Sequence, residues 1–221
     1  MAERASSAIE NLELEEYRLR LGGREWSVLH AGALLSFVDE QQFLGDEDRL
    51  PYGLVLWPAA IALGHEIAGR GPRLRGARVL ELGAGTGLPG IVASAFGARV
   101  TQTERHEAAL SLCRSNGDRN RVAGIEYRAG DWVHWDDTSR YDWIVGADII
   151  YAESTQAHLR RIFETNLAAG GRILLSDPYR LSSVRFLETL DRHGWNVTMA
   201  KWTIGEGELA RAVGVFELTA A

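Results

Sequence analysis

The sequence predicts an α/β protein, in which helices cover both faces of a mainly parallel, doubly wound sheet of seven strands. Three observations lead to this prediction. From residue 77 onward, short apolar runs alternate with patterns of helical spacing, as in chains that form βαβ units. A glycine-rich turn follows the first of these runs, and the last two strand patterns have no full helix between them. We therefore expect a Rossmann-like sheet with an antiparallel final strand.

The N-terminal part has a different pattern. Residues 16–31, EYRLRLGGREWSVLHA, alternate around a Gly-Gly pair and predict a β-hairpin. Residues 31–53 look like an irregular connection without a clear period. We expect an N-terminal extension with a β-hairpin and a helical segment over residues 1–54, followed by one α/β domain over residues 55–221.

The elements of this domain follow in order along the chain. Strand patterns cover residues 77–83, 98–104, 124–128, 141–147, 172–177, 195–203 and 212–219. Helical patterns cover residues 55–69, 88–96, 106–120, 154–167 and 182–193. Because crossovers between parallel strands are right-handed, the loops that follow these strands meet at one edge of the sheet, where α/β proteins bind ligands.

The glycine-rich turn lies within VLELGAGTGLPG, residues 79–90. Its glycines are Gly83, Gly85 and Gly87, which is G-x-G-x-G counted from the strand. The dinucleotide fingerprint G-x-G-x-x-G matches only from Gly85, two residues late, and a phosphate-binding P-loop is excluded because no Gly-Lys-Ser/Thr follows. The glycines alone leave the ligand open.

Two carboxylates narrow the choice of ligand. Glu81 near the tip of the first strand would repel a pyrophosphate and favour a ligand that carries an ammonium or sulfonium group. Glu104 ends the second strand, where a carboxylate can hold ribose hydroxyls. S-adenosylmethionine combines these features, since it has an adenosine, a cationic methionine end and no phosphate. The alternative is that both residues are exposed acids at strand ends.

Composition argues against several classes of partner and site: nucleic acid, membrane and metal. The net charge of −6 offers no broad basic surface for nucleic acid, and no apolar run approaches the length of a membrane helix. One cysteine and six scattered histidines suggest no metal site, and the His-Glu pair at 65–66 lacks the second histidine of H-E-x-x-H. We expect a cytoplasmic protein with no nucleic-acid or membrane partner.

The chain resembles the class I, seven-β-strand methyltransferases, and within them the family-16 group that includes protein lysine methyltransferases. Five segments carry this resemblance in family order: LPYGLVLWPAAIALGHEI, ELGAGTGLP, VTQTERHEAALSLCRSNGDRN with two spaced asparagines, GDWVHWD and VGADIIYAES. The last segment contains D-x-x-Y, from Asp148 to Tyr151. The family more often has Asp where this chain has Glu104.

The resemblance implies a cofactor and a set of site residues. S-adenosylmethionine would be the methyl donor, with S-adenosylhomocysteine as the product. Cofactor-binding residues would be Trp57, Glu81, Gly83, Ala84, Gly85, Thr86, Gly87, Glu104, Asp131, Trp132 and Ala147. Within this set Glu81 would orient the ammonium of the methionine end, Glu104 the ribose, and Asp131 and Trp132 the adenine.

The resemblance also implies two catalytic residues, Asp148 to orient the accepting amine and Tyr151 to line its channel. Asp177, after the fifth strand of the domain, is a further candidate at the acceptor site. Alternative roles are a helix cap for Asp148 and packing at the edge of the sheet for Tyr151. For Trp57 the alternative is packing of the N-terminal extension onto the core.

The expected acceptor is a protein lysine. A small-molecule amine or another protein side chain stays open as the acceptor. Two other classes also stay open: an NAD-dependent oxidoreductase, and a module that binds nucleosides without catalysis.

Overall fold

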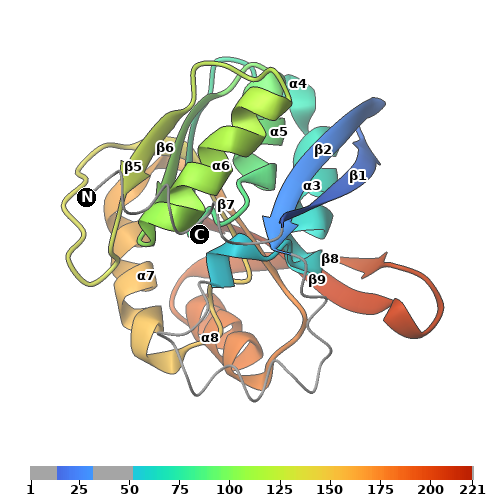
Figure 1. Ribbon diagram of the computed structural model, residues 1–221. Helices are drawn as coiled ribbons and strands as arrows, with labels where there is room; N and C mark the ends of the chain where they lie inside the picture. The colour runs from blue at the N-terminus through green and yellow to red at the C-terminus, as the bar shows by residue number, and fades with distance from the viewer. Residues whose placement is uncertain (1–13, 32–51, 221) are drawn as a thin grey trace.

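The structure is a computed structural model and describes residues 14–31 and 52–220. Its centre is a seven-stranded sheet in the order β5-β4-β3-β6-β7-β9-β8 (Figure 1). The strands are β3 (Arg78–Leu82), β4 (Arg99–Glu104), β5 (Glu126–Ala129), β6 (Tyr141–Ala147), β7 (Leu167–Asp177), β8 (Trp195–Ile204) and β9 (Arg211–Ala220). The predicted α/β class and the seven strands are confirmed.

The final strand, β9, is antiparallel to both of its neighbours, as predicted. It does not lie at the edge of the sheet, however, but is inserted between β7 and β8. The link from β8 to β9 holds only the short helix η2 (Gly207–Leu209), so β9 turns back directly onto β8. The other side of β9 then pairs with β7, and β8 becomes the edge strand.

Helices cover both faces of the sheet. The main helices are α3 (Pro58–Gly69), α5 (Leu88–Ala95), α6 (Glu107–Arg119), α7 (Glu153–Asn166) and α8 (Leu181–Arg192), and a short α4 (Gly71–Leu74) follows α3. In Figure 1, α3, α5 and α6 lie on one face, and α7 and α8 on the other. Strand residues alternate between the faces: Val79 packs in the cluster that contains α3 and α5, and Leu80 in the cluster that contains α7 and α8.

Two predicted boundaries shift by three residues or more. Helix α3 begins at Pro58 rather than at residue 55, because proline suits the first helical position, where its missing N–H is not needed. Strand β7 begins at Leu167 rather than at residue 172, with a register irregularity between its first pairing with β6 and the rest. The predicted connection over residues 31–53 falls mostly outside the described residues.

The predicted hairpin is present as β1 (Leu14–Leu21) and β2 (Arg24–Ala31). Its Leu21 and Trp26 are buried in the same cluster as α3 and α5, and the Trp26 indole N–H donates to the Leu21 carbonyl over 3.1 Å. The hairpin therefore shares the core of the α/β unit.

Two asparagines of α6 fasten the hairpin to the sheet unit. The Asn120 side chain accepts a hydrogen bond from Ser27 N (3.0 Å) and donates to Ser27 O (2.7 Å). Asn116 makes the same pair of bonds to Leu29, at 2.7 and 3.0 Å. Four helical residues rise about 6 Å and two strand residues about 6.6 Å, so the two amides match alternate residues of β2. These are the two asparagines that the resemblance singled out without a role.

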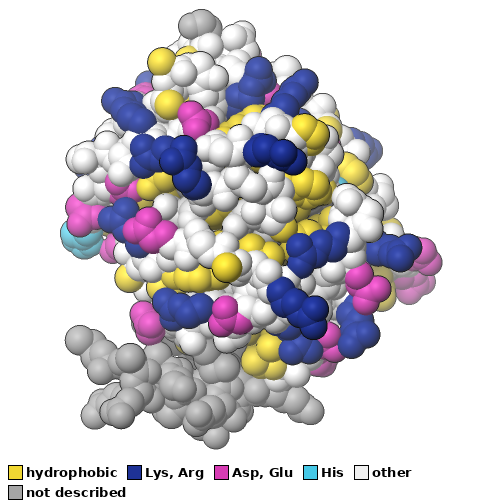
Figure 2. Space-filling view, turned by 90° about the horizontal axis from the view of Figure 1, so that it is seen from above, with side chains coloured by type: hydrophobic (Ala, Val, Ile, Leu, Met, Phe, Trp, Pro, Cys, Tyr) yellow, Lys and Arg dark blue, Asp and Glu magenta, His cyan; other side chains and the backbone are white. Residues whose placement is uncertain are grey.

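The surface in Figure 2 carries basic side chains spread over the visible face, with acidic side chains among them. Among the described residues, no helix is both long and apolar enough to cross a membrane.

Candidate active site

The glycine loop between β3 and α5 is built on left-handed backbone. The φ angles of Gly83, Gly85 and Gly87 are 61°, 54° and 82°, a region that side-chain-bearing residues rarely adopt. A Cβ at Gly85 would lie 3.2 Å from the Gly53 carbonyl oxygen, because the short helix η1 (Tyr52–Leu54) passes close by. The G-x-G-x-G spacing is therefore a requirement of the turn and of its close neighbours.

Glu81 lies beneath this loop and not beside it. It is the fourth residue of β3, on the face covered by α5, and only 1% of it is exposed. Its Oε2 accepts hydrogen bonds from Gly90 N in the first turn of α5 (3.0 Å) and from the Gln102 side chain. Burial raises the pKa of Glu81 to about 8, against the hydrogen bonds from Gln102 and Gly90, which lower the pKa. The expectation of a strand-tip acid facing a ligand is thus corrected, since a sheet covered on both faces buries this position.

Glu104 ends β4 at the glycine loop and is 7% exposed. Its Oε2 accepts from Gly85 N (3.2 Å), and its Oε1 accepts from Arg105 N (2.8 Å) and His106 N (3.1 Å). Backbone donors thus fix this carboxylate at the edge where the strands end.

Asp131 and Trp132 follow β5, and they point in different directions. The Trp132 ring covers the loop, since a Cβ at Gly83 would lie 3.2 Å from Trp132 Cζ2. Asp131 is exposed and forms a local turn, in which its side chain accepts from Val133 N (2.9 Å) and contacts His134 Nδ1 (3.0 Å). Its pKa is lowered by the hydrogen bonds with His134 and Val133.

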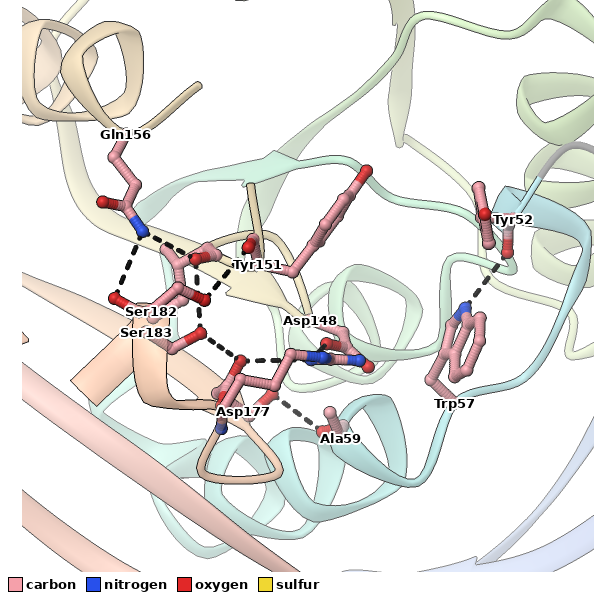
Figure 3. A network of polar contacts seen from close by, with 12 residues as sticks. Tyr52, Trp57, Ala59, Asp148, Tyr151, Gln156, Asp177, Ser182 and Ser183 are labelled. Atoms are coloured by element: carbon pink, nitrogen blue, oxygen red, sulfur yellow. Dashed lines mark hydrogen bonds and ion pairs between the residues drawn. The ribbon is translucent and has the colours of Figure 1, made fainter. Parts of the chain in front are cut away.

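Trp57 precedes α3 and is half-buried. Its indole N–H donates to the Tyr52 carbonyl over 3.1 Å, so it braces η1, which passes the glycine loop. Figure 3 shows Trp57 on one side of Asp148 and Tyr151 on another. Trp57 therefore holds part of the N-terminal extension against the α/β unit, which is the packing role that the sequence left open.

Asp148 directly follows β6 and has a left-handed backbone, with φ of 59°. Such a conformation in a non-glycine residue costs about 1–3 kcal/mol and is typical of functional sites. Its N–H donates to Ser176 O (2.8 Å) at the end of β7, and the next side chain, Ile149, contacts Gly83. Asp148 does not cap α7, because the N-cap is Ala152 and makes no side-chain cap bond.

An arginine that the sequence analysis did not single out joins Asp148 to Asp177. Arg180 Nη1 donates to Asp148 Oδ1 and, over 3.2 Å, to Asp177 Oδ2. Arg180 N also donates to Asp177 Oδ1 over 2.8 Å, and Ser183 Oγ donates to Asp177 Oδ2 over 2.7 Å. Asp177 is fully buried, so the candidate of the sequence analysis supports Arg180 and does not face an acceptor. The available signal was S-D-P-Y-R, which places an arginine three residues after the acid at a helix start.

Tyr151 is half-buried in the same network. Its carbonyl accepts from Ser182 Oγ over 3.1 Å, and the Ile150 carbonyl accepts from Ser183 Oγ (3.2 Å) and Gln156 Nε2 (3.0 Å). The start of α8 thus holds the D-x-x-Y segment in place through side chain to backbone bonds.

These residues fit the ligand that the resemblance implies. Three residues of the glycine loop have no side chain, and the side chains of Ala84 and Thr86 are buried. Glu104 is held at the strand ends, and an aromatic ring lies over Gly83. In the described part of the chain, no three His, Cys, Asp or Glu side chains are grouped as metal ligands would be.

Comparison with known proteins agrees with this reading. A family model described as lysine methyltransferase matches residues 40–193. Protein N-lysine methyltransferase METTL21A of Xenopus tropicalis is 38% identical over 153 residues, covering 67% of this chain and 71% of that protein. Histone-arginine methyltransferase METTL23 of Xenopus laevis is 32% identical over 146 residues, covering 62% of this chain and 61% of that protein.

A likeness in fold extends to solved structures. The 16S rRNA methyltransferase RsmC of T. Thermophilus, solved in complex with AdoMet and guanosine, superposes with a TM-score of 0.64 at 19% identity. The match covers 94% of this chain and 51% of that chain.

Proposed function

This chain belongs to the lysine methyltransferase family and is an S-adenosylmethionine-dependent methyltransferase, and we propose that it methylates lysine side chains of a protein. The observation that carries the proposal is the position of D-x-x-Y. Asp148 and Tyr151 lie inside the matched residues 40–193 and follow β6, the strand that pairs with β3 ahead of the glycine loop.

We assign the cofactor residues as follows. The backbone of the glycine loop, from Gly83 to Gly87, and Ala147 at the end of β6 would line the methionine end, with Glu104 at the ribose and Trp132 at the adenine. Glu81 would act through the loop that it supports, because its carboxyl is buried beneath α5. Trp57 would act through η1, and Asp131 through its exposed turn beside Trp132.

The chemistry needs a neutral amine held in line with the donor. S-adenosylmethionine, when bound, supplies a methyl group on a sulfonium sulfur, which keeps the C–S electron pair as the amine nitrogen forms the new N–C bond. Asp148 would orient the amine by accepting its N–H, and the proton lost from nitrogen would pass to water or to this carboxylate. Tyr151 would line the channel, where an aromatic face favours a cationic amine. Positioning and exclusion of water are the main contributions of the protein.

Arginine is a second candidate acceptor. The observation in its favour is the 32% identity to a histone-arginine methyltransferase, whose name states that acceptor. A small-molecule amine also remains a candidate acceptor.

The charge and cysteine content favour a cytoplasmic location, which stays a prediction.

The acceptor can be read from the product. The protein is incubated with tritium-labelled S-adenosylmethionine and a heat-treated cell extract, the proteins are hydrolysed to amino acids, and methyl-lysines are separated from methyl-arginines. We expect label in methyl-lysine. Asp148→Asn should abolish labelling while S-adenosylhomocysteine still raises its melting temperature, by a few degrees at about 100 times the dissociation constant. Absence of methyl-lysine with the wild type would refute the proposal.

A further inference from the structure

We propose that Arg180 makes the acceptor end of the site selective for a lysine amine over an arginine guanidinium. The inference rests on the proposed role of Asp148 as the residue that orients the acceptor. It concerns a side chain that lies next to the acceptor end and that the proposed transfer itself does not use.

The first step is that the Arg180 guanidinium is fixed and does not sample the surface freely. Its Nη1 donates to Asp148 Oδ1 and Asp177 Oδ2, and its backbone N–H donates to Asp177 Oδ1. Asp177 is fully buried and is held in turn by Ser183. Only 20% of the Arg180 side chain is exposed, and 7% of that of Asp148.

The local backbone supports the same view. Three non-glycine residues in the described ranges have a positive φ, and two of them belong to this region: Asp148 (59°) is a member of the ion pair, and Tyr179 (66°) directly precedes Arg180. Strained backbone persists only where the surrounding contacts impose it. The ion pair between Arg180 and Asp148 is therefore one of the contacts that hold the backbone in this conformation at the ends of β6 and β7.

The second step concerns an incoming arginine. A guanidinium binds a carboxylate best as a planar fork, with two parallel N–H donors on the two oxygens. Asp148 Oδ1 already accepts from Arg180 Nη1, so an arginine substrate would place a second guanidinium beside the first. Like charges in direct contact at a partly buried site disfavour this arrangement.

The third step concerns an incoming lysine. An amine needs no fork and can be oriented through one N–H, and it must be neutral to attack. A fixed positive charge nearby lowers the pKa of a lysine, and each unit of lowering increases the neutral fraction about tenfold. Arg180 thus disfavours arginine and favours the reactive form of lysine. Without its positive charge, the carboxylate of Asp148 beside the acceptor would favour the unreactive ammonium form of lysine.

The test compares neutral and charged replacements in the product assay. Arg180→Gln and Arg180→Met remove the charge at similar length, and Arg180→Lys keeps a charge without the fork. Asp148→Asn serves as the background control. Only variants whose melting temperature rises with S-adenosylhomocysteine as in the wild type are compared, so two neutral variants guard against a failure to fold.

We expect the wild type and Arg180→Lys to label methyl-lysine alone. In the folded neutral variants, the amount of label in methyl-lysine should fall at least about tenfold, and methyl-arginine should appear as a new product. A folded neutral variant that still labels only lysine would overturn the inference, and so would methyl-arginine from Arg180→Lys. If the wild type itself forms no methyl-lysine, the proposed function fails and not merely the role of Arg180.

Discussion

Glu81→Gln should remove a pH dependence of folding that the buried carboxyl creates. Burial gives Glu81 a pKa of about 8 in the folded protein, against 4.5 as the ordinary value. Because the folded-state pKa is the higher of the two, the stabilising contribution is fully present below pH 4.5 and is lost as the pH rises through about 8. Glutamine has nearly the shape of the neutral acid, and its oxygen can still accept from Gly90 N and Gln102.

The size of the effect follows from the two pKa values. One pKa unit corresponds to about 1.4 kcal/mol, so the whole shift corresponds to about 5 kcal/mol. About half of this free-energy difference falls between pH 5.5 and 7.5, where unfolding is readily measured. Between pH 5.5 and 7.5, the wild type should lose about 2–3 kcal/mol of unfolding free energy relative to Glu81→Gln.

Urea unfolding of both proteins at pH 5.5, 6.5 and 7.5 measures this difference. His65, whose pKa is lowered by burial, titrates in both proteins, so its contribution cancels in the comparison. Equal pH dependence in the two proteins would show that Glu81 is ionised in the folded state and that this account of its burial fails.

Other predictions concern the same loop and its supports. Asn116→Ala and Asn120→Ala should each destabilise the protein by about 2–4 kcal/mol in urea unfolding, since buried amide partners are left unpaired. Only Asn116 also donates to the Thr86 carbonyl (2.9 Å), so calorimetry should find weaker S-adenosylhomocysteine binding for Asn116→Ala alone, and equal losses would contradict this link. Gly87→Ala should lower the melting temperature by at least several degrees, because φ is 82° and a Cβ would lie 2.5 Å from Cys113 Sγ; an unchanged value would show that the loop relaxes. Cys113 is buried and burial raises its pKa, so a thiol reagent at pH 8 should react only after unfolding, and rapid reaction of the native protein would argue against this packing.

Local sequence patterns determined the architecture and the outline of the site. Alternation of strand and helix patterns indicated a parallel sheet, and parallel strands place the loops that follow them at one edge. The glycine loop after β3 and Asp148 after β6 were therefore predictable as neighbours, because both follow strands of that sheet. The short link after β8 likewise predicted an antiparallel final strand. These inferences depend on the repeat of apolar residues, every 2 residues in a strand and every 3.6 in a helix. Each repeat can be recognised within a single segment of the sequence.

The tertiary structure alone decided which side chains meet. Glu81 is buried because α5 packs across the face of β3 that it shares with Val79, and nothing within the strand itself states which helix covers that face. Arg180 lies 32 residues from Asp148 in sequence, and they meet because β6 and β7 are adjacent in the sheet. The insertion of β9 between β7 and β8 depends in the same way on which strand edges remain to be paired. Strand order and helix packing bring distant residues together, and the interactions that fix them act across the fold, so no single segment of sequence contains them.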